Sequence, residues 1–297
     1  MARTITVHIV NAFVVGGTGG NPAGVVLDAD DLSETDKQEV AAAVGVSETA
    51  FVSRSKVAAF KLDFFTPNMR IPHCGHATIA AFSYLVSIGL VGDGLSSKET
   101  VDGPRRIIVR GGIPYMEQLA PDYDDPINWA SRNTREQDVI DSLGLKDGLL
   151  DKRARPVVVN TGNRFLLVGV ESVAVLRSIV PDFEAITTVS ERLNLVGYYV
   201  YTTEGVSAGR DASTRMFAPR YAIREEAATG MAAGTLGCLL YDRLGIHKQR
   251  FSIEQGLSMQ PPSESQLTVE LDVPDGRISG VLVGGTGKLM RTTTAHI

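Results

Sequence analysis

The first hundred residues contain apolar patterns of strand length separated by polar and turn-forming segments. Positions 4–13 alternate apolar and polar side chains, and positions 49–52 and 60–65 form two further apolar runs. These patterns predict three strands, and the second begins directly after Glu48. Residues 21–24, Asn-Pro-Ala-Gly, are typical of a turn.

Two helices are predicted in the same part of the chain from different signals. The first has Ser33 as its N-cap, with Asp36 three residues later, and Gly45 at its C-terminal left-handed position. The second covers 77–90, where serine and threonine are the only polar residues. A surface helix would carry a charged stripe, so this helix is predicted to be buried on all sides.

The second half of the chain repeats the order of the first. A Phe-x-Pro segment occurs at 65–67 and again at 217–219, and each precedes a polar stretch, small residues and an apolar helix. Aligning Cys74 with Met231, an offset of 157 residues, also pairs Thr78 with Thr235 and Tyr84 with Tyr241. We therefore expect two copies of one α/β unit, each built around a central helix.

The boundary between the copies is expected where the composition changes. Positions 116–135 are polar and acidic, which is typical of a crossover between domains. Beyond it, 155–160 and 165–170 predict two strands joined by a turn.

Composition and charge exclude several classes of protein. Of the 297 residues 43% are apolar, and 29 basic against 34 acidic side chains give a net charge of −5. A nucleic-acid partner is not expected, because polyanion-binding proteins usually carry positive charge. The longest apolar stretch, 79–91, is interrupted and falls short of the roughly 18 residues typical of a membrane span. No leader pattern opens the chain, and two cysteines form no disulfide framework, so the reducing cytoplasm is expected.

The two central helices begin at loops of small residues, at 74–77 and 229–233. The first N–H groups of a helix have no internal partner, and the helix dipole is positive at that end. Such a start could bind a carboxylate of a small molecule. The alternative is close packing of a buried helix against a sheet.

Cys74 and His76 are chemically versatile residues at the first of these loops. A Cys–His dyad is not expected, because residues two apart on a helix point in different directions. Cys74 could still act as an acid/base group, since a helix N-terminus lowers a thiol pKa, or it could simply pack. Together with His73 these residues are metal-ligand types, but no second cluster follows, so a metal site is not expected.

Three carboxylates are candidates for proton transfer. Glu48 lies between apolar segments, where burial would raise its pKa toward neutrality, although a cap or surface role is the alternative. Glu225 and Glu226 precede the second helix, where they could serve catalysis or the helix dipole. The glycine clusters at 16–20 and 284–287 lack the spacing of nucleotide-binding loops and are interpreted as turns.

Seven segments along the chain together carry a family resemblance. They are Asn-Pro-Ala-Gly-Val at 21–25, Ser-Glu-Thr-Ala-Phe-Val at 47–52, Phe-Thr-Pro at 65–67, Cys-Gly-His-Ala-Thr at 74–78, Arg-Met-Phe-Ala-Pro at 215–219, Ala-Thr-Gly-Met-Ala-Ala-Gly at 228–234 and Glu-Gln-Gly at 254–256. In order and spacing the chain resembles the phenazine-biosynthesis isomerase-like (PhzF-like) family, relatives of diaminopimelate epimerase.

The resemblance implies an α+β fold of two pseudo-symmetric lobes. Each lobe is expected to be a mostly antiparallel sheet curled around a central helix, with the active site between them. The N-terminal lobe is expected at 1–118 and the C-terminal lobe at 119–287, with a final strand at about 288–297 returning to the first. The resemblance also implies a small-molecule substrate, no cofactor, no metal and commonly a homodimer.

The resemblance implies that Glu48 removes a proton from a carbon next to an activating group and returns it elsewhere in the conjugated system. His76 is expected to help hold the substrate, and Cys74 and Glu226 are further candidate acid/base or substrate contacts. The expected substrate-binding residues are Asn21, Gly75, Ala77, Thr229, Gly230, Met231 and Ala232. The chain departs from the family pattern with Glu226 for aspartate, Ala227 for proline, Met231 for serine, and Met259-Gln260 for Gly-Arg.

Three functions follow as hypotheses. The first is a PhzF-like isomerase acting on a small carboxylated metabolite by acid/base catalysis. The second is an epimerase or racemase using Cys74, and the third is an inactive small-molecule-binding protein of the same fold. Because a thioether has no proton to give, Met231 cannot complete a two-thiol pair, and diaminopimelate is not expected to be epimerised.

Overall fold

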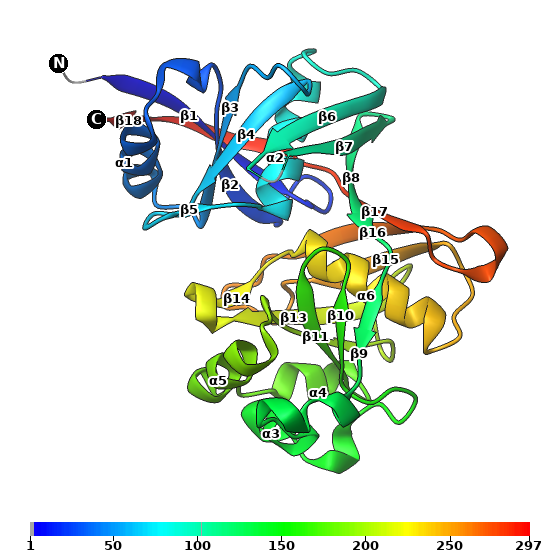
Figure 1. Cartoon of the computed structure of the whole chain (residues 1–297). Coiled ribbons are helices and arrows are strands. Elements are labelled where there is room, and N and C mark those ends of the chain that lie inside the picture. Colours follow the sequence, from blue (N-terminus) through cyan, green and yellow to red (C-terminus); the bar gives the residue numbers. More distant parts are fainter. Residues whose placement is uncertain (1–2, 102) are drawn as a thin grey trace. The chain divides into compact units, whose positions relative to one another are not determined.

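The structure, a computed structural model, describes residues 3–101 and 103–297. The chain divides into two compact units, coloured along the sequence in Figure 1. The first unit contains the described residues up to Glu117 together with Gly284–Ile297, and the second unit is Gln118–Val283. Each helix of the described chain is too short or too polar to cross a bilayer.

The first unit is a mostly antiparallel sheet with the strand order β18-β1-β2-β3-β4-β6-β7-β8. The β2–β3 and β4–β6 pairs are parallel, and the short β5 lies antiparallel to β4. The elements are β1 (Thr4–Ala12), β2 (Asn21–Val26), η1 (Ala29–Asp31), α1 (Glu34–Val44), β3 (Glu48–Ser53), β4 (Phe60–Phe65), β5 (Arg70–Ile71), α2 (Gly75–Ser87), β6 (Gly94–Thr100), β7 (Gly103–Arg110), β8 (Ile113–Leu119), which continues past the boundary, and β18 (Lys288–His296).

Helix α2 is the central helix of the first unit. Its ten residues from His76 to Leu85 are all buried, and it packs against β1, β2 and β3 (Figure 1). The helix contains no aspartate, glutamate, lysine or arginine, and the buried helix expected from its composition is confirmed. It begins at Gly75 and ends at Ser87, because Gly89 takes a positive φ of 76° that stops the helix.

Helix α1 is delimited by its caps. The Ser33 Oγ accepts the Asp36 N–H at 3.1 Å, and the Asp36 carboxylate accepts the Ser33 N–H at 2.9 Å, which completes a capping box. Gly45 ends the helix in the left-handed conformation with φ of 69°. Both ends predicted from the sequence are confirmed.

The turn predicted at residues 21–24 is wrong, because these residues form the start of β2. Ala12 pairs with Asn21, and Asn11 pairs with Pro22. The chain reverses earlier, at 16–20, where four glycines take φ values between 57° and 82°. Pro22 is tolerated in the strand because pairing with β3 begins one residue later, at Ala23.

The second unit is also a mostly antiparallel sheet, with the order β9-β10-β11-β12-β13-β15-β16. The β11–β12 and β13–β15 pairs are parallel, and β14 lies antiparallel to β13. The elements are β9 (Asp122–Asp124), η2 (Pro126–Asn128), η3 (Ala130–Arg132), α3 (Glu136–Ser142), η4 (Asp147–Leu149), β10 (Val157–Asn160), β11 (Arg164–Gly169), α4 (Val173–Ser178), α5 (Phe183–Leu193), β12 (Gly197–Thr202), β13 (Ala212–Ala218), η5 (Pro219–Tyr221), β14 (Ile223–Glu226), α6 (Gly230–Asp242), β15 (Arg250–Gln255), β16 (Ser265–Asp272), η6 (Pro274–Gly276) and β17 (Gly280–Gly284).

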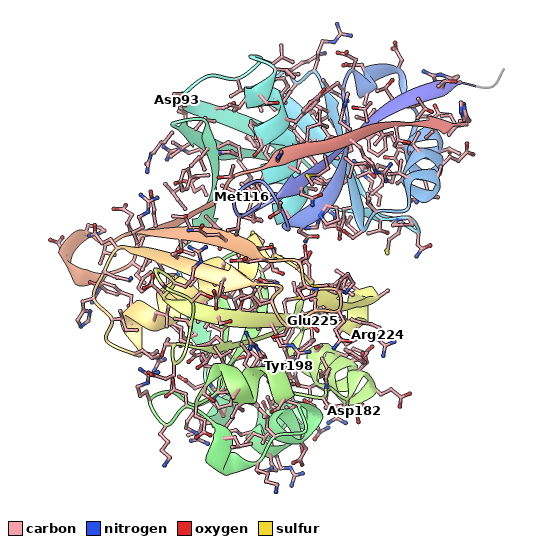
Figure 2. The ribbon with its side chains drawn as sticks, turned by 180° about the vertical axis from the view of Figure 1, so that it is seen from behind. Asp93, Met116, Asp182, Tyr198, Arg224 and Glu225 are labelled. Atoms are coloured by element: carbon pink, nitrogen blue, oxygen red, sulfur yellow. The ribbon has the colours of Figure 1, made fainter. Side chains whose placement is uncertain are left out.

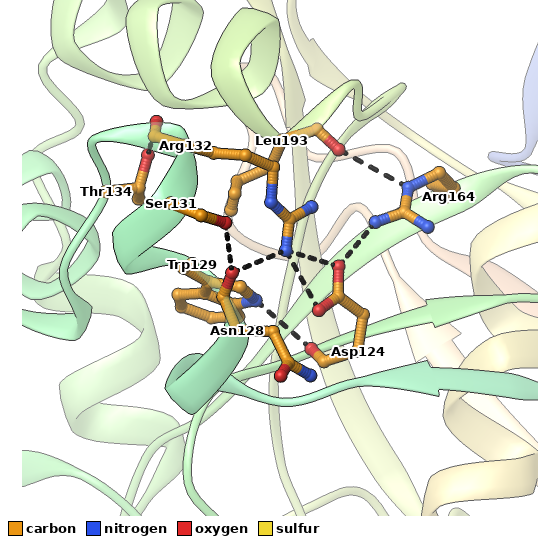
Figure 3. A network of polar contacts seen from close by, with 8 residues as sticks. All are labelled: Asp124, Asn128, Trp129, Ser131, Arg132, Thr134, Arg164 and Leu193. Carbon is orange, nitrogen blue, oxygen red and sulfur yellow. Dashed lines mark hydrogen bonds and ion pairs between the residues drawn. The ribbon is translucent and has the colours of Figure 1, made fainter.

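A polar network anchors the acidic segment at the start of the second unit (Figure 3). The Asp124 carboxylate accepts hydrogen bonds from Arg132 at 2.8 and 2.9 Å and from Arg164 at 2.7 Å. The Asp124 carbonyl accepts the indole N–H of Trp129, which is fully buried, at 3.2 Å. This part of the acidic stretch is therefore folded into the second unit rather than forming a free linker.

The two units share one order of elements. Each has a hairpin (β1–β2 or β10–β11), one or two helices (α1, or α4 and α5) and two antiparallel strands (β3–β4 or β12–β13). A short strand (β5 or β14), a central helix (α2 or α6) and a second hairpin (β6–β7 or β15–β16) follow. The same pairs of strands are parallel in both units, which confirms the predicted α+β fold and its internal repeat.

The register of the repeat differs from the prediction. The central helices begin at Gly75 and Gly230, a difference of 155 residues, so their N-caps are Cys74 and Thr229. The predicted match of Cys74 with Met231 at 157 residues is wrong, because runs of small residues do not define a register by themselves. By position in the helix, Met231 corresponds to His76.

Candidate active site

Glu48 is the first residue of β3, whereas the sequence predicts a strand that begins one residue later, with Glu48 at the junction of loop and strand. All six residues of β3 are buried, because β2 pairs with the strand on one side and β4 on the other. Ala23 of β2 pairs with Glu48 itself. Glu48 is therefore held by its backbone in the middle of the sheet, and its carboxylate lies in the interior of the first unit.

The carboxylate of Glu48 and the imidazole of His76 form a buried pair. Glu48 Oε2 lies 3.1 Å from His76 Nε2, and the two side chains are 5% and 3% exposed. Among the described residues, no donor meets hydrogen-bond geometry at this oxygen. Oε2 therefore retains a lone pair that can accept a proton, and a protonated His76 would attract the ionised carboxylate.

The charge of Glu48 is set by competing effects. Burial raises the pKa of its carboxyl, but the positive charge of a protonated His76 and the polar groups of His76 and Ser47 outweigh this effect, so that the pKa is lowered. The prediction of a raised pKa for Glu48 is therefore wrong. The apolar residues beside it in the sequence indicate its burial correctly, but they do not show His76, which lies far away in the sequence and lowers the pKa. The ionised carboxylate that results is the form a general base needs.

Cys74 lies beside His76 in the same cluster. Its Sγ is 3.5 Å from His76 Nδ1 and accepts the Ala77 N–H at 3.5 Å. As the N-cap of α2, Cys74 has extended backbone angles of φ −144° and ψ 119°. The helical spacing rule does not apply to such a residue, so the prediction that Cys74 and His76 point apart is wrong.

The thiol of Cys74 does not show the acidity that a helix N-terminus predicts. Burial raises its pKa, and the lowering effect of His76 does not compensate. The lowered pKa expected from the helix dipole is therefore wrong for this residue. A protonated thiol is a candidate proton donor rather than a base.

Glu48, Cys74 and His76 each place one ligand atom within 4.8 Å of the other two. Carboxylate, thiolate and imidazole all bind zinc, so a cation site is a second interpretation of the cluster. His73, the other ligand type in the sequence, is not part of this group. The absence of a metal, expected from the sequence, therefore stays a prediction to be tested.

Three predicted binding residues lie in β2 and α2, the strand beside Glu48 and the helix that carries His76. Asn21 opens β2, two residues before the partner of Glu48, and its side chain is buried. Gly75 is the first residue of α2, and Ala77 is fully buried in the first turn. The structure thus places these residues, with Glu48, Cys74 and His76, in the first unit.

The remaining predicted residues lie in the second unit, around the start of α6. The Thr229 hydroxyl donates to the Glu226 carboxylate. Gln255 also fixes the segment between Glu226 and Thr229. Its Nε2 donates to the Glu226 carbonyl at 2.7 Å, and its Oε1 accepts the Thr229 N–H at 3.1 Å. Gln255 was not among the predicted site residues, although the Glu-Gln-Gly segment that contains it is one of the seven resemblance segments.

The other residues of this start form the helix itself. The carbonyl of Gly230 accepts a hydrogen bond from Gln118 Nε2 at 3.0 Å. Ala232 is fully buried, and Met231 is partly exposed. The burial of Ala232 is consistent with close packing, and ligand binding at this helix start stays a prediction.

Glu225 has a different environment from Glu226. Arg215 Nε and Nη2 each donate to its carboxylate at 2.9 Å, and Arg215 is itself buried. Figure 2 shows Glu225 next to Arg224, whose guanidinium lies 4.6 Å from the centre of the Phe183 ring. Of the two adjacent glutamates, Glu226 is therefore the one at the helix start, and Glu225 holds β14 to β13.

Comparisons with known proteins agree with this architecture. A family model described as phenazine biosynthesis-like protein matches residues 10–293. The trans-2,3-dihydro-3-hydroxyanthranilate isomerase of Pseudomonas aeruginosa is 28% identical over 300 residues, covering 97% of this chain and 98% of that protein. A Deinococcus radiodurans protein named uncharacterized isomerase is 32% identical over 297 residues, covering 95% and 92%.

A solved structure is similar over the same length. The crystal structure of a PhzF-family phenazine biosynthesis protein from Bacillus anthracis is 27% identical and superposes with a TM-score of 0.88. The match covers 99% of this chain and 100% of that one. Both units, and not only one of them, therefore have counterparts in known proteins.

Proposed function

Because this chain belongs to the phenazine biosynthesis-like protein family, a family of isomerases, we propose that it is a cofactor-independent isomerase of a small carboxylated metabolite. The observation that carries the proposal is the buried pair of Glu48 and His76 at the start of α2. A carboxylate that is buried, ionised and open to a further proton is suited to general-base catalysis.

In the proposed reaction one carboxylate performs both proton transfers. Glu48 Oε2 removes a proton from a carbon next to an activating group and returns it to another carbon of the conjugated system. His76, 3.1 Å away, favours the ionised carboxylate before the first transfer. Protonated Glu48 is then a comparatively strong acid, which favours delivery of the proton to the product.

The first turn of α2 supplies a site for the carboxylate of the substrate. The Gly75 N–H is the first of the helix and has no intrahelical acceptor. Because Gly75 has no side chain, an anionic group can approach the helix end, where the dipole favours negative charge. This site lies next to His76 in sequence, so the bound molecule would be held close to Glu48.

Deuterium exchange tests the proposal directly. The protein is incubated in deuterated buffer with a panel of unsaturated carboxylates, beginning with trans-2,3-dihydro-3-hydroxyanthranilate, the compound in the name of the Pseudomonas relative. We expect NMR to show loss of one carbon-bound proton and a shifted double bond. The rate should be unchanged after dialysis against EDTA, and its loss would favour the cation interpretation. Absence of exchange across the panel would contradict the proposal.

A second candidate function uses Cys74, because its thiol lies in the same cluster as Glu48 and His76. In that case the exchange would occur at an amino-acid α-carbon with inversion, and Cys74→Ala would abolish it. Binding of panel members without any exchange would instead support the third hypothesis, a binding protein of the same fold.

We also propose a cellular and oligomeric setting for the reaction. Both cysteines are free thiols, as expected for a protein of the reducing cytoplasm. We expect a homodimer, which light scattering of the purified protein would test, and no nucleic-acid partner, in line with the net charge of −5.

A further inference from the structure

Lys98 of β6 is a buried lysine without a balancing carboxylate. It is 2% exposed and faces the central helix α2 rather than solvent. No carboxylate among residues 3–101 and 103–297 lies within ion-pair distance of its Nζ, whereas the other buried lysine of this unit, Lys37, contacts Asp63 at 2.7 Å. Lysine is seldom fully buried unless it is paired, so this position needs an explanation.

The ammonium of Lys98 has one strong partner. Its Nζ donates to Thr78 Oγ1 at 2.6 Å. The other contacts are weaker: the Met116 sulfur lies at 3.8 Å, and the centre of the Phe64 ring at 5.3 Å. The charge of Lys98 is therefore directed at the side chain of Thr78 in the first turns of α2.

Thr78 passes this interaction to the backbone at the start of the helix. Its hydroxyl donates to the Cys74 carbonyl at 2.6 Å, and its N–H donates to the same carbonyl at 3.2 Å. That carbonyl belongs to the same peptide group as the Gly75 N–H. Hydrogen bonds in a chain polarise one another, so pulling electron density toward the carbonyl makes the N–H a stronger donor.

We propose that Lys98 is a positioning residue for anion binding: through Thr78 and the Cys74 carbonyl, its charge strengthens and fixes the Gly75 N–H that faces the substrate. The inference rests on the proposed function, in which the first turn of α2 holds a carboxylate. Lys98 itself touches neither that carboxylate nor the reacting atoms.

The state of this relay depends on pH. Burial lowers the pKa of Lys98 from 10.5 to about 8, with Cys74 opposing the shift and Arg105 of β7 adding to it. Cys74 and Arg105 are the titratable or charged groups that act on Lys98 from the elements packed around it, while β4 and β8 present Phe64 and Met116. Lys98 therefore changes charge within the range in which enzymes are assayed.

NMR of the ligand-free protein tests the relay without any substrate. The amide shifts of Gly75 are followed from pH 6 to pH 10 in the wild type, in Lys98→Met, and in Thr78→Val, which removes the hydroxyl but leaves the charge. We expect a titration near pH 8 in the wild type that disappears in both variants. Lys37→Met, which removes the paired buried lysine, should leave it unchanged. A Gly75 amide that does not titrate near pH 8, or that titrates equally in all four proteins, would overturn the inference.

Binding of a matched pair of ligands tests the consequence. Anthranilate carries a carboxylate, and anthranilamide is its neutral counterpart. At pH 7 we expect Lys98→Met to weaken binding of anthranilate about tenfold and binding of anthranilamide less than twofold, since charge-assisted hydrogen bonds are about twice as strong as neutral ones. Equal effects on both ligands would contradict the inference. If no proton exchange were detected but the Gly75 amide still titrated near pH 8 in the wild type and not in Lys98→Met, the proposed function would be contradicted and the inference about Lys98 would stand.

Discussion

Two buried ionisable side chains near the first turn of α2 respond differently to burial. Burial disfavours charge in both Glu48 and Lys98. Glu48 has the imidazole of His76 within 3.1 Å, which restores its charge, whereas Lys98 has only the neutral hydroxyl of Thr78 at 2.6 Å. Glu48 is therefore held ionised, whereas Lys98 is still mostly protonated at pH 7 but loses its proton near pH 8.

Replacement of Glu48 by glutamine should abolish turnover with little effect on folding. The amide has nearly the same shape but cannot accept the proton, and general acid–base groups typically contribute about 10²–10⁴-fold. The measurement is the deuterium-exchange rate, with circular dichroism to check the fold. Glu39→Gln, an exposed glutamate of α1, is the matched control. Near wild-type exchange in Glu48→Gln would remove this residue from the mechanism.

Replacement of His76 by glutamine should shift the acid side of the pH profile. His76 lowers the pKa of Glu48, and without it the effect of burial remains and the pKa rises. Activity requires ionised Glu48, so in the wild type it should fall only below about pH 4.5, the ordinary carboxyl value. In the variant the fall in kcat/KM should begin at higher pH. An unchanged acid limb would show that His76 does not control this charge.

Replacement of Lys98 by methionine should stabilise the protein at neutral pH. A pKa lowered from 10.5 to about 8 corresponds to a penalty of roughly 3 kcal/mol for the protonated form in the fold. The unfolded chain binds the extra proton between these values, so wild-type stability should rise from pH 8 to pH 10.5. Urea unfolding at pH 7 and pH 10.5 should show the gain of the variant shrinking with pH. A less stable variant at pH 7 would contradict this.

Sequence information reaches only part of this chemistry. The place of Glu48 at the start of a strand follows from the apolar run after it, which is a local signal. Its partner comes from a helix whose contact with β3 depends on the whole sheet. Lys98 lies in the polar stretch Ser-Ser-Lys-Glu-Thr, which indicates exposure. Its burial arises because β6 pairs with β4 and faces α2, which no local pattern encodes.

At the scale of elements, termini defined by side-chain chemistry are predictable and those defined by tertiary pairing are not. The ends of α1 follow from Ser33 and Gly45, which act through bonds and angles within a few residues. The strand at residues 21–24 contradicts the local turn signal of Asn-Pro-Ala-Gly, because pairing with β1 outweighs it. The register of α6 relative to α2 was missed by two residues, because the runs of small residues before both helices do not define a register.

Replacement of Ser33 by alanine should destabilise the first unit by about 1 kcal/mol, because the N–H of Asp36 loses its capping acceptor. Thr35→Ala, at an exposed position of the same helix, is the control and should have an effect below about 0.5 kcal/mol. Chemical denaturation of both variants provides the comparison. Equal losses would show that the cap contributes nothing specific.

At the scale of the whole chain, the two units depend differently on sequence order. The second unit is one continuous segment, Gln118–Val283, whereas the sheet of the first unit includes β18 from the far end of the chain. β18 pairs with β1 from Thr4–His296 to Asn11–Lys288. The first unit is therefore the one that a C-terminal deletion should damage.

Deletion of residues 285–297 should unfold the first unit and spare the second. Trp129, the only tryptophan of the chain, is fully buried in the second unit and reports on it alone. Its fluorescence should keep the emission of a buried indole, while circular dichroism shows a loss of sheet. Retention of the full circular dichroism signal after the deletion would contradict this dependence on β18.

The pairing of β1 with β18 also orders events while the chain is being made. β1 leaves the ribosome first, but its partner follows only after residue 287, when the whole second unit has already emerged. The second unit lies between the two parts of the first unit in the sequence. At synthesis rates of about 5–20 residues per second, its translation takes on the order of ten seconds or more. During that time one edge of β1 has no strand beside it. The first unit, which carries Glu48, is thus the first part to be translated, but its sheet is complete only when β18 has been made. A chaperone that binds unpaired strands could bind β1 during this interval.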